Sequence, residues 1–317
     1  MKIKQILNED REINSLSLYN RATKELGCKN TISFSQLDMY TSCPLKWYLS
    51  NVKRLKYDDP SIHMLYGSAF HKLLFKWLRK FYEESSRKAG ELDFHAMLLQ
   101  YMQEEFRSIV KNVKDKSFTS APELSEFHGY GMECMKYLIK HRGAYFSKRG
   151  YELIGLEYPL IMKSEFNPNL GLIIMIDILL YNIQNKIYYL KDVKTSMRGW
   201  DKEKKGDPST KNQLLLYKKA LCDVYQLSPE EINTEYMIFR NTVPENSEFP
   251  VKRIQIVSPA NGKNSMNKFS NTMKEFIENC FLPDGSRNPD ISRYAKTTNN
   301  QSCRWCPYKK HGACTGV

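Results

Sequence analysis

The spacing of apolar residues along the chain changes near residue 151. Before that point apolar side chains recur every three or four positions, as in GSAFHKLLFKWLRKFYEE (67–84), which is typical of an amphipathic helix. The charge-rich segments 91–112 and 126–147 continue in a helical manner. This part of the chain is therefore predicted to be largely helical, preceded by a polar, partly helical arm over residues 1–30.

Three apolar runs rich in β-branched and aromatic residues follow, separated by turn-prone residues. They are YELIGLEYPLIM (151–162), GLIIMIDILLYN (171–182) and KIYYLKDVKTS (186–196), and each run predicts a β-strand. The next segment, RGWDKEKKGDPSTKN (198–212), is polar and contains Gly and Pro, which predicts a mobile loop.

Helical and strand-like patterns alternate in the rest of the chain. A helix is predicted over 212–225, a strand over 233–241 and a helix over 264–280, before a loop-rich tail over 282–317. Helices on both sides of a small sheet indicate an α/β or α+β fold.

Charge and composition narrow the class of protein. Lys and Arg number 48 against 35 Asp and Glu, a net charge of +13, which favours a polyanionic partner such as nucleic acid over simple solubility. The longest apolar run, residues 170–181, is interrupted by Asp177 and is too short to cross a bilayer. The N-terminal segment turns acidic before a signal-peptide core develops. We therefore expect a cytoplasmic protein with no membrane attachment.

Two aspartates interrupt the predicted strands. Asp177 lies within GLIIMIDILL and Asp192 near the end of KIYYLKDVKTS, although an isolated buried carboxylate is very costly. If the turn between these strands centres on residues 184 and 185, the numbers of paired residues sum to 369. Asp177 and Asp192 would then lie opposite each other on one face, about 5 Å apart. Lys194 would point to the same side as Asp192.

Such a group of charges suits a particular chemistry. Two adjacent carboxylates repel each other unless a proton or a cation lies between them. Hard divalent ions such as Mg²⁺ take one or two carboxylates and complete their shell with water and phosphate oxygens. A lysine beside them can polarise a water molecule or steady a phosphate. The set predicts metal-assisted phosphodiester hydrolysis, and the alternative is a buried Asp–Lys ion pair that stabilises the hairpin.

The order of GSAFH, IMID, DVK and QLLLY resembles the RecB-type branch of the PD-(D/E)XK nucleases. The resemblance implies a restriction-endonuclease-like core, with a small mixed central sheet flanked by helices, a helical insertion and a Cys-rich tail. It implies a nuclease domain over 31–281, made of a helical part over about 31–150 and a catalytic sheet core over about 151–245. The tail over 282–317 would close the domain.

The resemblance also implies a role for each residue that matches a family motif. These residues are His71, Glu157, Asp177, Asp192, Lys194, Gln213 and Tyr217. The histidine and the two aspartates would bind Mg²⁺ or Mn²⁺, and the lysine would position and activate the attacking water. The glutamine and tyrosine would shape the site and touch the DNA strand, and the glutamate is a weaker match. Taken singly, the histidine could be a core residue, and the Gln–Tyr pair could reflect helix packing.

Cysteines in the tail indicate a metal centre. Cys303 and Cys306 form a C-x-x-C turn, and Cys314 follows a short loop later, so three thiolates require a fourth ligand. The resemblance supplies Cys43, because iron–sulfur members of the branch bind a [4Fe–4S] cluster through one cysteine before the nuclease motifs and three after them. A zinc site with four thiolates would use the same ligands, so zinc remains an alternative to the cluster. His311 is an alternative ligand.

The other four cysteines have no partner at ligand spacing, and we expect them to be small buried residues. They are Cys28, Cys134, Cys222 and Cys280.

Basic and aromatic residues that follow the Asp-x-Lys strand are candidates for DNA contact. They are Arg198, Trp200, Lys204, Lys205 and Lys211, with Tyr217 on the next helix. Together they could hold the backbone and stack a base, and an ordinary solvated loop is the alternative.

The function predicted from the sequence is a divalent-metal-dependent deoxyribonuclease with a [4Fe–4S] cluster. The resemblance implies an exonuclease on single-stranded DNA, with 5′ to 3′ polarity favoured, in repair, recombination or replication. A helicase, a single-strand-binding protein or a recombination protein would be its partner. The alternatives are a CRISPR-adaptation-type or structure-specific endonuclease, and a DNA-binding protein that keeps the fold without cutting.

Overall fold

The centre of the molecule is a mixed β-sheet whose longest strands form an antiparallel meander. The computed structural model describes residues 3, 15–57, 59–112, 118–244 and 251–315. Within these residues six strands form one sheet. They are β1 (Asn30–Ile32), β2 (Tyr151–Lys163), β3 (Leu170–Asn182), β4 (Ile187–Ser196), β5 (Ile232–Arg240) and β6 (Ile254–Val257).

The strand order combines antiparallel hairpins with parallel additions. The described strands run in the order β1-β3-β4-β5-β6, and β2 also pairs with β3. β2, β3 and β4 are successively antiparallel, and so are β5 and β6, whereas β5 is parallel to β4 and β1 is parallel to β3. Two consecutive parallel strands need a crossover connection. Between β4 and β5 the helical segment 202–225 supplies it.

The hairpin between β3 and β4 has the register predicted from the sequence. Its ladder runs from Ile178 paired with Lys191 to Asn182 paired with Ile187, so the numbers of each pair sum to 369. The ladder ends one position before Asp177 and Asp192, which therefore lie side by side where the two strands begin to separate.

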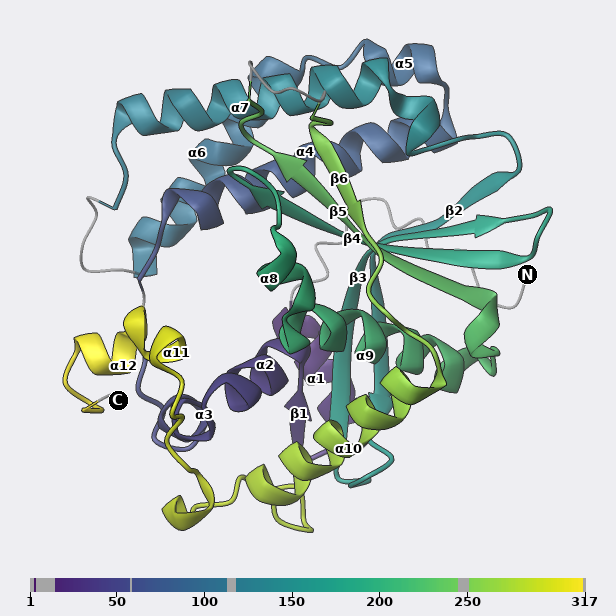
Figure 1. Ribbon diagram of the computed structural model, residues 1–317. Coiled ribbons are helices and arrows are strands. Elements are labelled where there is room, and N and C mark those ends of the chain that lie inside the picture. The colour runs from purple at the N-terminus through teal and green to yellow at the C-terminus, as the bar shows by residue number, and fades with distance from the viewer. Residues whose placement is uncertain (1–2, 4–14, 58, 113–117, 245–250, 316–317) are drawn as a thin grey trace.

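Helices cover both faces of this sheet (Figure 1). The α-helices of the described residues are α1 (Ser15–Glu25), α2 (Phe34–Ser42), α3 (Pro44–Asn51), α4 (Ile62–Glu83), α5 (Ser86–Gly90), α6 (Phe94–Asn112), α7 (Ala121–Lys140), α8 (Lys202–Gly206), α9 (Pro208–Tyr225), α10 (Lys263–Cys280), α11 (Asn300–Arg304) and α12 (Pro307–Lys310). Short 3₁₀ turns lie at Arg142–Ala144, Pro229–Glu231 and Ile291–Arg293.

The two faces of the sheet build two apolar cores. Because successive side chains of a strand alternate between faces, Val193 and Phe239 join the core beneath α4 and α7, whereas Leu190 and Ile238 join the core beneath α9 and α10. The fold is a mixed α/β arrangement with a small mixed sheet between helices, which confirms the predicted class.

The segment 198–212 is not the predicted loop. It contains α8 and the start of α9, and each helix begins at an aspartate. The Asp201 side chain accepts a hydrogen bond from the backbone N–H of Lys204 at 2.8 Å, and the Asp207 side chain accepts one from Ser209 at 2.9 Å. Pro208 occupies the first turn of α9, where its missing N–H costs nothing. The Asp and Pro residues that resemble loop signals are in fact helix starts.

The tail packs against the segment that contains Cys43. The Leu45 N–H donates to the Ala295 carbonyl at 3.2 Å, and the Tyr308 hydroxyl donates to the Leu55 carbonyl at 3.0 Å. The Trp47 ring stacks on Tyr294 with centroids 5.7 Å apart. These contacts join parts of the chain that are far apart in sequence. In the part of the chain that the structure describes, every helix is too short or too polar to span a bilayer.

Candidate active site

Asp192 and Lys194 lie on the same face of β4, as predicted. Asp192 is 1% exposed and is paired in parallel register with Tyr236 of β5. The Lys194 Nζ lies 2.7 Å from Asp192 Oδ2. Because the carboxylate is buried and the Lys194 side chain is 35% exposed, their attraction is screened less than that of a fully exposed pair.

Asp177 extends the hairpin with its side chain. Its Oδ2 accepts a hydrogen bond from the backbone N–H of Val193 at 2.8 Å, one position beyond the last backbone pair. His71 reaches the same carboxylate from α4, with its Nδ1 3.9 Å from Asp177 Oδ2. The sheet and α4 thus bring together three of the residues that the sequence predicted as metal ligands.

Gln213 of α9 holds Asp192 from the opposite side. Its Nε2 donates to Asp192 Oδ1 and to the Tyr217 hydroxyl oxygen, both at 2.9 Å. Tyr236 contacts the other end of this amide, because its one hydroxyl proton is shared between the Thr210 carbonyl at 2.7 Å and Gln213 Oε1 at 3.2 Å. The amide can therefore present its nitrogen, and not its oxygen, to Asp192.

Burial sets the protonation of the acidic residues. It raises the pKa of Asp177 and of Asp192 from 3.8 to about 6 each, against the opposing effect of the Lys194 ammonium. For Lys194 burial acts to lower the pKa, but the two carboxylates outweigh it, and the pKa lies above its ordinary value. At neutral pH the site holds two carboxylates and one ammonium.

The histidine and the tyrosines of the site are neutral at the same pH. Burial, and then the charge of Lys194, lower the pKa of His71 to about 4, so its imidazole can act as a neutral ligand or acceptor. Burial raises the pKa of Tyr217 and of Tyr236 well above the usual range, so both keep their hydroxyl protons.

The arrangement suits a hard divalent cation. Asp192 Oδ2 is buried and lies 2.7 Å from the Lys194 ammonium, and among the described residues it has no hydrogen-bond partner besides this ammonium. No three His, Cys, Asp or Glu side chains of the described residues form a ready-made metal cage. Mg²⁺ does not need one, since it takes one or two carboxylates and keeps several waters.

Glu157 lies on β2 across from Asp177. Its neighbours Leu156 and Tyr158 pair with Ile178 and Ile176, which places Glu157 opposite the aspartate. Its φ of 49° is in the left-handed region, which is sparsely populated for a residue with a side chain. The side chain is exposed, and its charge contributes to the raised pKa of Asp177. The predicted acidic position is therefore adjacent to the site.

Comparison with known proteins now decides the family. A family model for the PD-(D/E)XK nuclease superfamily matches residues 31–311. The chain belongs to this superfamily. The search of curated proteins found no match. A crystal structure described as "Putative exonuclease" from Eubacterium rectale is similar to this nuclease, with a TM-score of 0.44 and 11% identity, over 84% of this chain and 83% of that chain.

The residues predicted to contact DNA lie in different environments in this nuclease. Arg198 and Lys205 are exposed, and Lys211 is half-buried. Trp200 packs on Tyr236 with ring centroids 4.8 Å apart, so it is a support of the site rather than a residue of a mobile loop. Lys204 pairs with Asp207 at 3.0 Å and lies 6.0 Å from the Trp200 ring centroid.

The four predicted ligand cysteines of the nuclease line a single cavity. Cys43 lies between α2 and α3, and Cys303, Cys306 and Cys314 reach the same cavity of about 20 Å³ from the tail. His311 does not line it and instead stacks on Tyr57 with centroids 4.4 Å apart. Four thiolates are a donor set that a cluster or a zinc ion takes, but among the described residues these cysteines do not come together as a group that could hold a metal ion.

The remaining cysteines mostly have the environment predicted for them. Cys28, Cys134 and Cys280 are buried, whereas Cys222 is only partly so. Burial raises the pKa of each of the four thiols, which is typical of structural cysteines.

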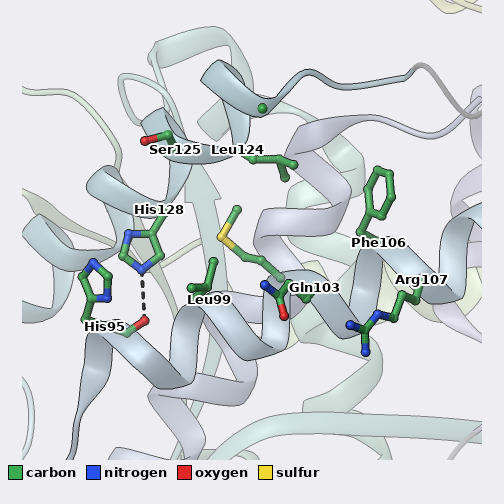
Figure 2. A pocket seen from close by; sticks show the side chains of 10 residues that line it. His95, Leu99, Gln103, Phe106, Arg107, Leu124, Ser125 and His128 are labelled. Atoms are coloured by element: carbon green, nitrogen blue, oxygen red, sulfur yellow. Dashed lines mark hydrogen bonds between the residues drawn. The ribbon is translucent and has the colours of Figure 1, made fainter.

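A larger cavity of about 530 Å³ lies between α6 and α7 (Figure 2). Apolar side chains such as Leu99 and Phe106 share its lining with polar ones, and His128 Nε2 lies 3.1 Å from the His95 carbonyl oxygen. None of the motif residues of the nuclease lines it. This cavity is therefore separate from the residues of the nuclease motifs.

One residue of the site was missed by reasoning from the sequence. Tyr236 contacts three residues of the site. Its hydroxyl lies beside Gln213 Oε1, its ring packs on Trp200, and Lys194 Nζ lies 5.9 Å from its ring centroid. The alternation of NTEYMIFRN places Tyr236 and Ile238 on one face. That signal becomes informative only once the register of β5 against β4 is known.

Proposed function

We propose that this protein is a divalent-metal-dependent deoxyribonuclease that hydrolyses phosphodiester bonds. The observation that carries the proposal is the convergence of Asp177, Asp192 and Lys194 at the diverging end of β3 and β4, with the Lys194 ammonium 2.7 Å from Asp192 Oδ2. A structural ion pair between Asp192 and Lys194 would leave the second buried carboxylate, Asp177, unexplained.

Each side chain has a role in this proposal. Asp177 and Asp192 would hold Mg²⁺ or Mn²⁺, with His71 as a further neutral ligand. The bound ion would lower the pKa of a water molecule and stabilise charge that develops on the phosphate. The Lys194 ammonium donates hydrogen bonds and would orient the attacking water or a phosphate oxygen. Gln213 keeps Asp192 in position, and Tyr217 would contact the strand beside it.

The resemblance of the motifs supports the finer assignment. In the RecB-type branch that order of motifs accompanies exonucleases on single-stranded DNA, and we propose this activity with 5′ to 3′ polarity, in repair, recombination or replication. Arg198, Lys205 and Lys211 would contact the backbone, and a helicase, single-strand-binding or recombination protein would be the partner. We place its action in the cytoplasm.

We favour a [4Fe–4S] cluster as the second metal centre because the motifs resemble the iron–sulfur members of the branch, and the four cysteines line one cavity. A zinc ion with the same ligands would require the four sulfurs to approach to about 3.8 Å of one another, given zinc–sulfur bonds of about 2.3 Å in a tetrahedron. A cluster holds its four thiolates farther apart, one on each iron. Protein purified without air should contain iron and acid-labile sulfide, and Cys43→Ser should lose both. Zinc in place of iron would reject the cluster.

Hydrolysis of end-labelled DNA tests the activity. Wild-type protein is incubated with single strands labelled at the 5′ or the 3′ end, with Mg²⁺, Mn²⁺ or no divalent ion. Lys194→Ala should lower the rate about a hundredfold or more, whereas Lys163→Ala, an exposed lysine of β2, should retain it. The label released first gives the polarity.

A circular single strand separates the two nuclease modes, because it offers no ends. Cutting of the circle would favour the endonuclease alternative. Absence of metal-dependent cutting on every substrate would reject the nuclease proposal in favour of a DNA-binding role.

A further inference from the structure

Trp305 of the tail is 82% exposed, which is unusual for the largest apolar side chain. The other tryptophans of the sequence are placed differently: Trp47 and Trp77 are buried, and Trp200 packs on Tyr236. Full exposure of an indole gives up a burial energy that folding normally uses. Its position therefore needs an explanation other than packing.

One arginine lies over this indole, and further lysines lie in the same part of the molecule. The guanidinium carbon of Arg304 lies 5.2 Å from the Trp305 ring centroid, and Lys309 is exposed on the next helix turn. Lys296 and Lys46 line the adjoining cysteine cavity. A single aromatic ring among cations fits an aromatic anion better than an apolar peptide, which would need a broader apolar surface.

Nucleic acid offers that combination, because each nucleotide carries a flat base and a phosphate. Base stacking on an aromatic side chain is independent of sequence, and a neighbouring arginine adds cation–π and phosphate contacts. A duplex keeps its bases stacked inside, so a free ring of this kind is accessible to single strands only.

We propose that Trp305 and Arg304 form a stacking site for a base of single-stranded DNA, outside the site built around Asp192. The proposal deepens the function proposed above and rests on its single-stranded substrate. It assigns a role to the residues between Cys303 and Cys306 in addition to holding a metal centre.

The surrounding structure fixes the backbone that carries this ring. The N–H of Cys306 donates to the Cys303 carbonyl at 3.3 Å, which closes the turn that carries Trp305. The helix that follows is tied to the segment before α4 by the Tyr308 hydroxyl bond to Leu55 and by Lys310, which pairs with Asp59 at 3.0 Å. Figure 1 shows α11 and α12 beside this segment, which leads into the helix that carries His71. A fixed backbone reduces the freedom that is lost when the ring binds a base.

Binding of unhydrolysed DNA tests the proposal independently of catalysis. Labelled oligothymidylate of about twelve nucleotides, within the span of known single-strand sites, is titrated with the full-length protein without divalent ions. Trp305→Ala should raise Kd about tenfold, equivalent to about 1.4 kcal/mol. Trp305→Phe should keep most of the wild-type affinity. Tryptophan emission should fall on binding in Trp200→Phe, where Trp305 is the exposed indole, and far less in Trp305→Phe.

Controls separate stacking from a general surface effect. Ile291→Ala removes another exposed apolar side chain, 56% exposed, and should leave Kd unchanged. Arg304→Gln should weaken binding several-fold, and Arg87→Gln, whose side chain is 84% exposed on α5, should not. Duplex DNA should bind Trp305→Ala and wild type equally.

Either of two results would overturn the proposal. One is an unchanged Kd in Trp305→Ala with unchanged melting temperature. The other is an equal loss on duplex and single strands. Because no divalent ion is present, failure of hydrolysis in the Lys194 experiment would leave this result unaffected, and the two proposals can fail separately.

Discussion

The Tyr236 hydroxyl is a single group on which the geometry of the candidate active site depends. Tyr236 is 1% exposed, and its hydroxyl lies 2.7 Å from the Thr210 carbonyl oxygen and 3.2 Å from Gln213 Oε1. Tyr236→Phe keeps the ring that packs on Trp200 and removes only the oxygen. We expect both stability and activity to fall, for separate reasons.

The loss of stability follows from the hydrogen bonds. A phenol has one proton to donate, so the change removes one good hydrogen bond and part of a second, and leaves two buried acceptors with fewer partners. A buried polar group left unsatisfied costs about 1–3 kcal/mol. We therefore expect Tyr236→Phe to lower the free energy of unfolding by about 1–3 kcal/mol.

The loss of activity follows from the Gln213 amide. Without the hydroxyl, Gln213 Oε1 loses its donor, and the amide is held only by the contacts of its Nε2 with Asp192 and Tyr217. The amide can then tilt, which weakens its hydrogen bond to Asp192 Oδ1 and lets the carboxylate shift. We expect kcat to fall about tenfold, the equivalent of about 1.4 kcal/mol, with little change in KM for DNA.

Urea unfolding and steady-state hydrolysis measure the two effects. Tyr130→Phe is the matched control, since that hydroxyl bonds to Glu126 one turn away on the surface of α7. It should change the unfolding free energy by less than about 0.5 kcal/mol. If Tyr236→Phe behaved like this control, the hydroxyl would not hold the amide and the reasoning would be refuted.

Two further predictions concern the pH dependence of stability and the packing of α7. In metal-free protein, burial raises the pKa of Asp192 to about 6 from 3.8, so its contribution to stability is full below pH 3.8 and is lost as pH rises through 6. Asp192→Asn should therefore show a smaller fall in melting temperature from pH 4 to 7 than wild type, and parallel curves would contradict this. A Cβ on Gly131 would lie 2.4 Å from Leu98 Cδ2 and 3.2 Å from Tyr66 Cε2, so Gly131→Ala should destabilise by about 1–2 kcal/mol. Gly129→Ala on the same helix meets no atom within 4 Å and should stabilise by about 0.5–1 kcal/mol, and equal signs in chemical denaturation would refute the packing argument.

The β3–β4 hairpin could be predicted from sequence because its determinants are local. Apolar alternation and a short turn fix the register, and the structure pairs Ile178 with Lys191 as that register requires. The placement of Asp177 beside Asp192 followed directly.

Other features depend on contacts that the sequence does not display. The helix starts at Asp201 and Asp207 were hidden because polarity reports exposure and says nothing about backbone conformation. The short strand β1 is too brief for a periodic pattern, and it exists through its pairing with β3. The position of Tyr236 depends on a parallel register set by a whole crossover helix.

The packing of the tail against the segment around Cys43 has a consequence for folding during translation. Tyr308 and Leu55, which share a hydrogen bond, are 253 residues apart. A ribosome that adds about 5–20 residues per second needs roughly 13–50 s to make that stretch. For most of this interval the aromatic side chains of Trp47 and Tyr48 have no Tyr294 to pack against. The nascent chain therefore exposes these apolar side chains until the tail is made, and it would need a chaperone most at this stage.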